Sequence, residues 1–123
     1  MISVALCTYN GEKYIGEQLE SIIDQTYKKL EIIVLDDAST DSTFDIVNAY
    51  ANRDSRIKCF RNNVNIGFNK NFEKALGLTS GEFIAISDQD DIWQPGKLQA
   101  LLDNIGDNWL IFSNSSYMGA SRQ

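Results

Sequence analysis

Three aspartates within four positions are the part of the sequence best suited to chemistry. Asp88, Asp90 and Asp91 directly follow the apolar run of residues 83–86. Because alternate residues of an extended strand point to the same side, Asp88 and Asp90 can act together. Two carboxylates on one side raise each other's pKa unless a cation lies between them. The pattern therefore predicts a site for Mg²⁺ or Mn²⁺, which takes one or two protein carboxylates and completes its shell with water and phosphate.

Two other polar turns also follow apolar, strand-like stretches. They are residues 8–11 (TYNG) and residues 36–39 (DDAS). Aspartate is common in turns and at helix starts, so capping is the alternative interpretation of Asp36 and Asp37, and of the later aspartates as well. The hypothesis of a ligand site depends on all three turns meeting at one edge of a sheet, where ligands of open α/β proteins bind.

Apolar periodicity predicts strands that alternate with helices. Strands are expected at residues 2–7, 31–35, 57–60, 83–87 and 110–112, and helices at about 12–25, after 43 to about 51, around 72–76, and from Pro95 through Ile105. This alternation favours right-handed crossovers and a mainly parallel sheet. The fold class that follows is a Rossmann-like, three-layer α/β/α domain with helices on both faces of the sheet.

Composition limits the classes of function. The 123 residues suit a single domain, and a net charge of -6 without basic clusters argues against nucleic acid as the partner. The purest apolar runs have four residues, far short of the roughly 20 that a membrane-spanning helix needs. Without histidine, these residues cannot supply an imidazole base or a histidine-ligated zinc. We expect a cytoplasmic chain whose two cysteines are free, buried thiols.

Two further residues are weaker candidates. Lys70 lies near a predicted helix start, where a lysine and free backbone N–H groups can reach phosphate oxygens, although a solvated lysine fits equally well. Trp93 follows the aspartates and could stack on a sugar ring or a base. An aromatic residue after a strand also commonly covers the core.

Four motifs occur together in a familiar order. They are ISVALCTYNG (residues 2–11), IIVLDDASTDST (32–43), NVNIGF (63–68) and GEFIAISDQDDIWQPGKL (81–98). This order and spacing resembles the nucleotide-binding half of family 2 glycosyltransferases, which are inverting enzymes with a GT-A fold. The version SDQDDIW is similar to that of bacterial rhamnosyltransferases and other polysaccharide enzymes.

The resemblance implies a role for each matching position. It places the metal, Mn²⁺ or Mg²⁺, on Asp90, base recognition on Asp37, and a sugar or acceptor contact on Asp91 and Trp93. The other positions that it implies for nucleotide-sugar binding are Thr8, Tyr9, Asn10, Glu12, Lys70, Asp88 and Gln89. The implied partners are a UDP- or dTDP-linked sugar and a saccharide or glycolipid acceptor.

The resemblance also implies that part of the enzyme lies elsewhere. The family's general base belongs to the second half of the catalytic domain, so we expect it beyond Gln123, and we expect the chain to be an N-terminal piece of a longer enzyme. That enzyme could work at the inner face of the membrane. A binding fragment without catalysis is one alternative. The other is a haloacid dehalogenase-type phosphatase, whose D-x-D-x-[TV] motif follows the first strand, whereas here the pair follows the fourth and Ile92 replaces Thr or Val.

The implied architecture has a consequence for the cysteines. It orders the strands 3-2-1-4, so the second strand separates Cys7 from Cys59. Two strand spacings amount to about 9 to 10 Å, which is too far for a disulfide. Both residues are therefore predicted to titrate as thiols.

Overall fold

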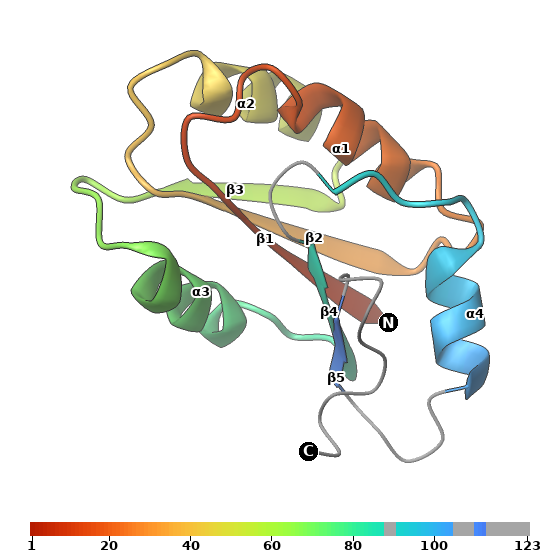
Figure 1. Ribbon diagram of the computed structural model, residues 1–123. Helices are drawn as coiled ribbons and strands as arrows, with labels where there is room; N and C mark the ends of the chain where they lie inside the picture. Colours follow the sequence, from red (N-terminus) through yellow and green to blue (C-terminus); the bar gives the residue numbers. More distant parts are fainter. Residues whose placement is uncertain (88–90, 105–109, 113–123) are drawn as a thin grey trace.

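Parallel strands form one sheet in the order β3-β2-β1-β4-β5 in the computed structural model, which describes residues 1–87, 91–104 and 110–112 (Figure 1). Every pair of neighbouring strands is parallel. The strands are β1 (Ile2–Thr8), β2 (Leu30–Asp36), β3 (Ile57–Arg61), β4 (Phe83–Ser87) and β5 (Leu110–Phe112). The predicted parallel sheet and its 3-2-1-4 order are confirmed.

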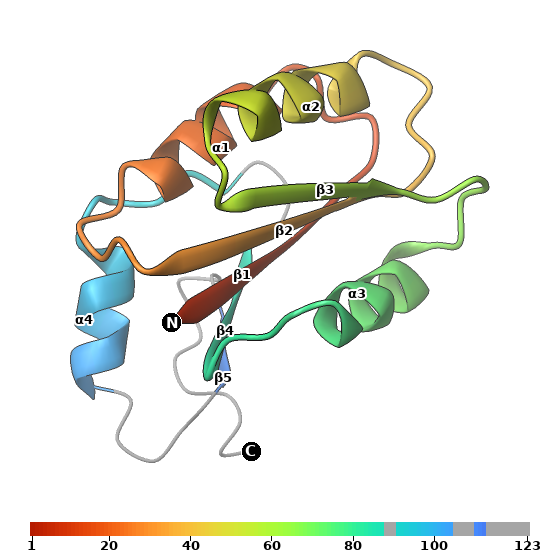
Figure 2. The same ribbon diagram turned by 180° about the vertical axis from the view of Figure 1, so that it is seen from behind.

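Helices cover both faces of this sheet, as the three-layer prediction requires. They are α1 (Ile15–Ile23), α2 (Thr43–Arg53), α3 (Phe68–Gly77) and α4 (Lys97–Asn104). Apolar side chains of α1, α2 and α4 share one core with one face of the sheet, whereas α3 packs on the opposite face (Figure 2). No helix in the described ranges is both long and apolar enough to cross a bilayer.

Alternation along β1 explains the two cores. All seven residues of β1 are buried, because the strand lies between β2 and β4 and both of its faces are covered. Val4 and Leu6 point into the larger core under α1 and α2, and Ala5 and Cys7 point into the smaller core under α3. A strand buried on both faces reads as a continuous apolar run, which is why the sequence reveals it.

The boundaries of three helices differ from the prediction. Helix α1 begins at Ile15 rather than at residue 12, because residues 10–12 instead bond to the turn after β2. Helix α3 begins earlier than predicted, at Phe68, directly after Gly67 with its positive φ of 89°. Pro95 lies in a turn two residues before α4, not at its first position. Ile105 is outside the described residues.

Neither cysteine forms a disulfide, as predicted. Cys7 is level with Leu35 on β2, and Leu35 is level with Phe60 on β3. Cys59 is therefore one residue out of register with Cys7, and the two side chains point to opposite faces of the sheet. The prediction of a buried thiol holds for Cys7 but is wrong for Cys59, which lies on the strand at the end of the sheet and is partly exposed.

Candidate functional site

A cavity of about 350 Å³ opens at the carboxyl ends of β1 and β2. We call it the β1–β2 cavity. Its volume falls in the range of roughly 300–1,000 Å³ that is typical of small-molecule sites. The residues that line it are Cys7, Thr8, Tyr9, Asp37, Asn65, Gly67, Phe68 and Asn71. Two of the three predicted polar turns, those after β1 and β2, therefore meet at one edge of the sheet.

Thr8 contributes a hydroxyl that the chain itself does not satisfy. The residue is 3% exposed, and its Oγ1 is buried with no hydrogen-bond partner among the described residues. An unpaired polar atom in a protein interior costs about 1–3 kcal/mol, so such atoms are rare and often mark functional sites. Thr8 lines the cavity, but Oγ1 itself is buried and lies next to Gly11, so this hydroxyl does not face the cavity.

Asp37 joins three segments around the cavity. Its Oδ1 accepts hydrogen bonds from the backbone N–H of Ile66 at 2.8 Å and from Asn62 Nδ2 at 2.9 Å, and its Oδ2 accepts one from the N–H of Gly67 at 3.0 Å. The N–H of Asp37 donates to the Thr8 carbonyl at 2.9 Å. The carboxylate thus holds the loop before α3 against the ends of β1 and β2.

Behind Asp37 lies a network of amides that sequence reasoning missed. Asn62 Nδ2 also donates to Asn71 Oδ1 at 2.7 Å, and Lys74 Nζ donates to Asn62 Oδ1 at 2.7 Å. Asn71 Nδ2 donates to the Leu35 carbonyl at 3.2 Å. The only signal in the sequence is the density of asparagines around Gly67, and such residues are equally common in plain loops.

Asn10 and Glu12 hold the first turn against the second. Asn10, with a positive φ of 50°, accepts the Thr40 N–H at 2.8 Å, and its own N–H donates to Ser39 Oγ at 2.8 Å. Glu12 Oε1 accepts the Ser42 N–H at 3.4 Å. Neither side chain lines the β1–β2 cavity, so their contact with a nucleoside stays a prediction.

The interpretation as a turn residue fits Asp36 rather than Asp37. Asp36 is fully buried, its Oδ2 accepts the Ser39 N–H at 3.0 Å, and the same oxygen lies 3.6 Å from Arg61 Nε. Asp41 Oδ1 accepts the Thr43 N–H at 2.9 Å at the start of α2. Burial raises the pKa of the Asp41 carboxyl, but hydrogen bonds from Thr43 and from the N–H groups of Glu12 and Asp41 together outweigh it and leave the pKa below its usual value.

The remaining predicted residues fall into two groups. Tyr9 is 42% exposed and lines the cavity, whereas Lys70 is exposed on α3 outside the lining. Asp88, Gln89 and Asp90 lie outside the described residues, so the third turn and its metal ligand stay predictions. Within the described ranges, no group of three or more His, Cys, Asp or Glu side chains could hold a metal ion.

Asp91 and Trp93 lie just after the acidic motif. Asp91 is partly buried, and its Oδ2 has no hydrogen-bond partner in the described part of the chain. Trp93 is 5% exposed and packs in the larger core, with Lys97 Nζ 5.4 Å from the ring centroid. This position favours the interpretation of Trp93 as a cover over the core, and its sugar contact stays a prediction.

Solved structures with the same arrangement define the class of protein. One is S. aureus TarS residues 1–349 in complex with UDP, with a TM-score of 0.77 and 36% identity over 87% of this chain and 33% of that one. Another is the mannosyltransferase PcManGT from Pyrobaculum calidifontis in complex with GDP-Man and Mn²⁺, with a TM-score of 0.80 and 30% identity over 86% of this chain and 32% of that one. The fold is that of GT-A glycosyltransferases.

The sequence identifies the family within this class. The model of glycosyl transferase family 2 matches residues 3–120. The chain belongs to this family, and the resemblance seen in its motifs is confirmed.

Curated relatives agree with this assignment. An uncharacterized glycosyltransferase of Haemophilus influenzae is 40% identical over 96% of this chain and 36% of its own length. The Escherichia coli glucosyltransferase WfaP is 38% identical over 95% of this chain and 46% of its own length. The chain therefore spans between about a third and a half of these relatives. Nothing in the comparisons favours a phosphatase.

Proposed function

We propose that this chain is the nucleotide-sugar-binding part of a glycosyltransferase that transfers a sugar, with inversion, from a nucleoside diphosphate to a saccharide or glycolipid acceptor. The observation that carries the proposal is the β1–β2 cavity, which Thr8, Tyr9 and Asp37 line at the carboxyl ends of the strands. This is where open α/β sheets bind their ligands.

The chemistry of the cavity suits a UDP- or dTDP-linked donor. A carboxylate such as Asp37 accepts an N–H, and uracil and thymine each present one at N3. Asp37 Oδ2 accepts one hydrogen bond from the protein, from Gly67, among the described residues, and a carboxylate oxygen has capacity for two. TarS was solved with UDP and with UDP-GlcNAc, which supports a uridine donor.

A divalent metal completes the proposal. Asp90 would hold Mn²⁺ or Mg²⁺, with Asp88 and Gln89 beside the sugar. The neighbouring Asp91 fits such a centre, since its Oδ2 is a buried carboxylate oxygen without a partner in the described residues. When bound, the metal neutralises charge on the diphosphate leaving group. PcManGT was solved with Mn²⁺.

The acceptor and the location are proposed from the relatives. WfaP is described as acting on an α-D-GlcNAc-diphosphoundecaprenol acceptor, and the Bacillus subtilis relative TuaG as a putative teichuronic acid biosynthesis enzyme. By analogy, this chain serves synthesis of a bacterial surface polysaccharide, in the cytoplasm or at the inner face of the membrane. The general base that activates the acceptor hydroxyl is assigned to none of the residues present.

Titration calorimetry with UDP, dTDP and GDP, each with and without Mn²⁺, tests the proposal. We expect UDP or dTDP to bind, and a chelator to weaken that binding. Binding without sugar transfer is the expected behaviour if catalysis needs residues beyond this chain. Failure of all three nucleotides to bind in the presence of Mn²⁺ would overturn the proposal, and hydrolysis of a phosphate ester would instead favour a phosphatase.

A further inference from the structure

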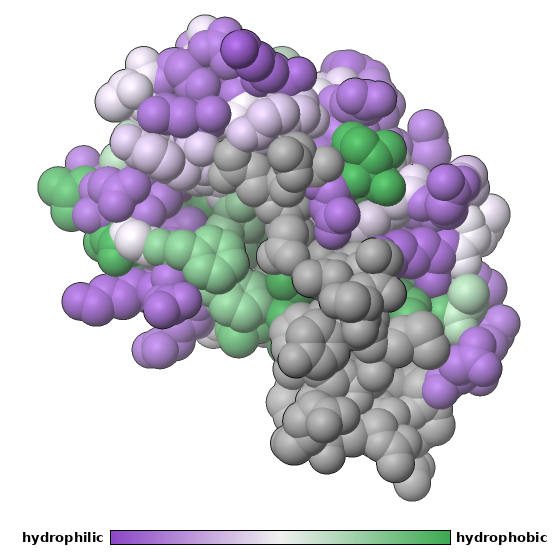
Figure 3. All heavy atoms as spheres, viewed as in Figure 1, coloured by the Kyte–Doolittle hydropathy of each residue, from purple (hydrophilic) through white to green (hydrophobic). Residues whose placement is uncertain are grey.

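Phe68 is a large apolar residue in an unusual place. It is 64% exposed, although it lines the β1–β2 cavity at the first position of α3. Apolar side chains also gather on the surface over the loop before α3 and over α3 itself (Figure 3). Among these, Phe68 combines exposure with a place on the cavity wall.

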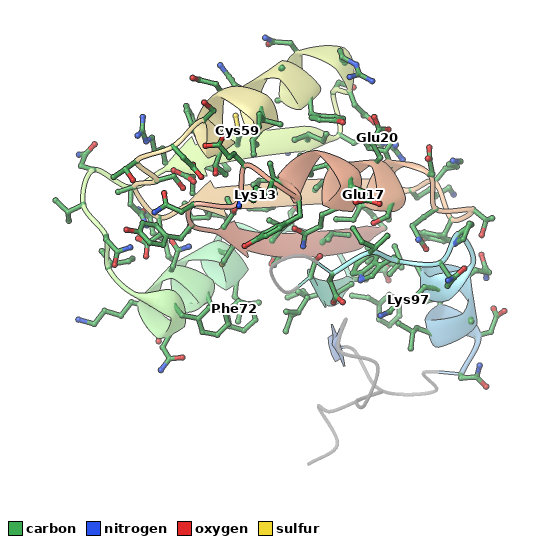
Figure 4. The ribbon with its side chains drawn as sticks, turned by 45° about the horizontal axis from the view of Figure 1, so that its top comes forward. Lys13, Glu17, Glu20, Cys59, Phe72 and Lys97 are labelled. Atoms are coloured by element: carbon green, nitrogen blue, oxygen red, sulfur yellow. The ribbon has the colours of Figure 1, made fainter. Side chains whose placement is uncertain are left out.

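One face of the Phe68 ring packs against a second phenylalanine. It stacks on Phe72, one helical turn later, with ring centroids 6.0 Å apart and planes 9° from parallel. Phe72 in turn packs against the smaller core on the α3 face of the sheet (Figure 4). Residues four apart share one face of a helix, so Phe72 supports one face of Phe68 and restricts its rotamers.

The backbone before Phe68 is fixed as well. Gly67 has φ 89° and ψ 160°, a conformation that residues with a Cβ rarely adopt, and its N–H is bound to Asp37. The same carboxylate accepts the N–H of Ile66. Asp37, the residue proposed to recognise the base, therefore also fixes the backbone that places Phe68 on the cavity wall.

We propose that Phe68 provides a stacking face for the nucleobase of the donor and so contributes to nucleotide affinity. The inference rests on the proposed function, because it assumes a nucleotide in the β1–β2 cavity. An exposed aromatic face beside hydrogen-bonding groups suits a base, which presents a π-face and polar edges. Asp37 would read the edge of the base, while Phe68 covers its face.

A scattered surface phenylalanine is ordinary and needs no ligand to explain it. Phe60 provides that comparison, because it is also exposed, lies on β3, and is absent from the lining of the cavity. Phe68 differs in its place on the cavity wall and in its stacking on Phe72. The two residues therefore form a matched pair for experiment.

The first test compares affinities for UDP and UMP in the presence of Mn²⁺. Base–aromatic stacking corresponds to a loss of between about 5-fold and 150-fold on removal of the ring. We expect Phe68→Ala to weaken both nucleotides by the same factor in this range, because they share the base. Phe68→Tyr should stay within about 2-fold of the wild type, and Phe60→Ala should have no effect. Full affinity in Phe68→Leu would overturn the inference, because leucine keeps apolar bulk but has no π-face.

The second test uses a reporter at the same position. Phe68→Trp should gain fluorescence that UDP quenches on stacking, whereas Phe60→Trp should not respond. Unchanged thermal unfolding of Phe68→Ala would show that the lost affinity is not a loss of fold. If the wild type binds UDP and none of these variants changes affinity or fluorescence, the stacking inference fails and the proposed function stands. If the wild type binds no nucleotide, both fail.

Discussion

Replacing Thr8 with valine should stabilise the protein and leave nucleotide binding unchanged. Valine has the same shape as threonine but no hydroxyl, so the variant removes the buried Oγ1 that has no partner among the described residues. An unsatisfied buried group costs about 1–3 kcal/mol. We expect Thr8→Val to recover about 1 kcal/mol of this, which corresponds to a rise in Tm of about 4 °C for a domain of this size.

The same substitution should leave UDP affinity within about 2-fold of the wild type. Valine keeps the shape of the residue, and the Oγ1 that is lost is buried rather than exposed to the cavity. Urea denaturation gives the free energy of unfolding, and calorimetry gives the affinity. The variant should therefore gain stability without a change in affinity.

Thr43 supplies a matched control. It is also a fully buried threonine, but its hydroxyl accepts the Gly11 N–H at 2.8 Å and donates to Asp41 Oδ1. Thr43→Val leaves these partners unsatisfied and should destabilise the protein by about 1–3 kcal/mol. The reasoning is refuted if Thr8→Val destabilises the protein as Thr43→Val does.

Three further predictions concern stability and thiol chemistry. Burial raises the pKa of Glu31, but hydrogen bonds from Ser3, Ser80 and Lys58 outweigh it and lower the pKa from 4.5 to about 2. Because the folded state has the lower pKa, the ionised Glu31 carboxylate stabilises the protein above pH 4.5, and about 3 kcal/mol of this stabilisation is lost as the pH falls to 2. Urea denaturation between pH 6 and pH 2 should show a smaller loss of unfolding free energy in Glu31→Gln than in the wild type. Gly67→Ala should lower the free energy of unfolding by about 1–3 kcal/mol, because alanine rarely adopts the backbone conformation of Gly67. Gly77→Ala, in a helix with open space around it, should be neutral or stabilising. Equal effects of the two substitutions on thermal unfolding would contradict this prediction. Ellman's reagent should titrate two thiols per chain in denaturant, and partly exposed Cys59 should react before buried Cys7 in the folded protein; a single reactive thiol in denaturant would count against two free cysteines.

Much of the fold could be predicted because its signals are local. Val4 and Leu6 belong to a continuous apolar run, and Ile15, Leu19 and Ile22 recur at helical spacing, so each element is visible within a short window. Turn chemistry was less informative about boundaries. The start of α1 depends on contacts between the turns after β1 and β2, which are about 30 residues apart in the sequence.

The candidate site was predictable only in outline. That polar turns gather at the carboxyl edge follows from parallel pairing, and the structure brings Thr8 and Asp37 together there. The resemblance singled out Asp37 rather than Asp36, but the bonds that separate their roles, from Ser39 to Asp36 and from Gly67 to Asp37, could not be predicted from local spacing. Asn62 was missed because its partner Asp37 lies 25 residues away, so neither residue marks the other.

The central claim is that a nucleotide binds in the β1–β2 cavity. The most direct measurement is an NMR titration of the ¹⁵N-labelled chain with UDP and Mg²⁺, which reports each backbone N–H separately. The account predicts the largest chemical-shift changes at Thr8, Asp37, Gly67 and Phe68, with little change at Ser80, whose N–H is bound to Glu31. Saturable changes confined to residues outside the cavity lining would contradict it.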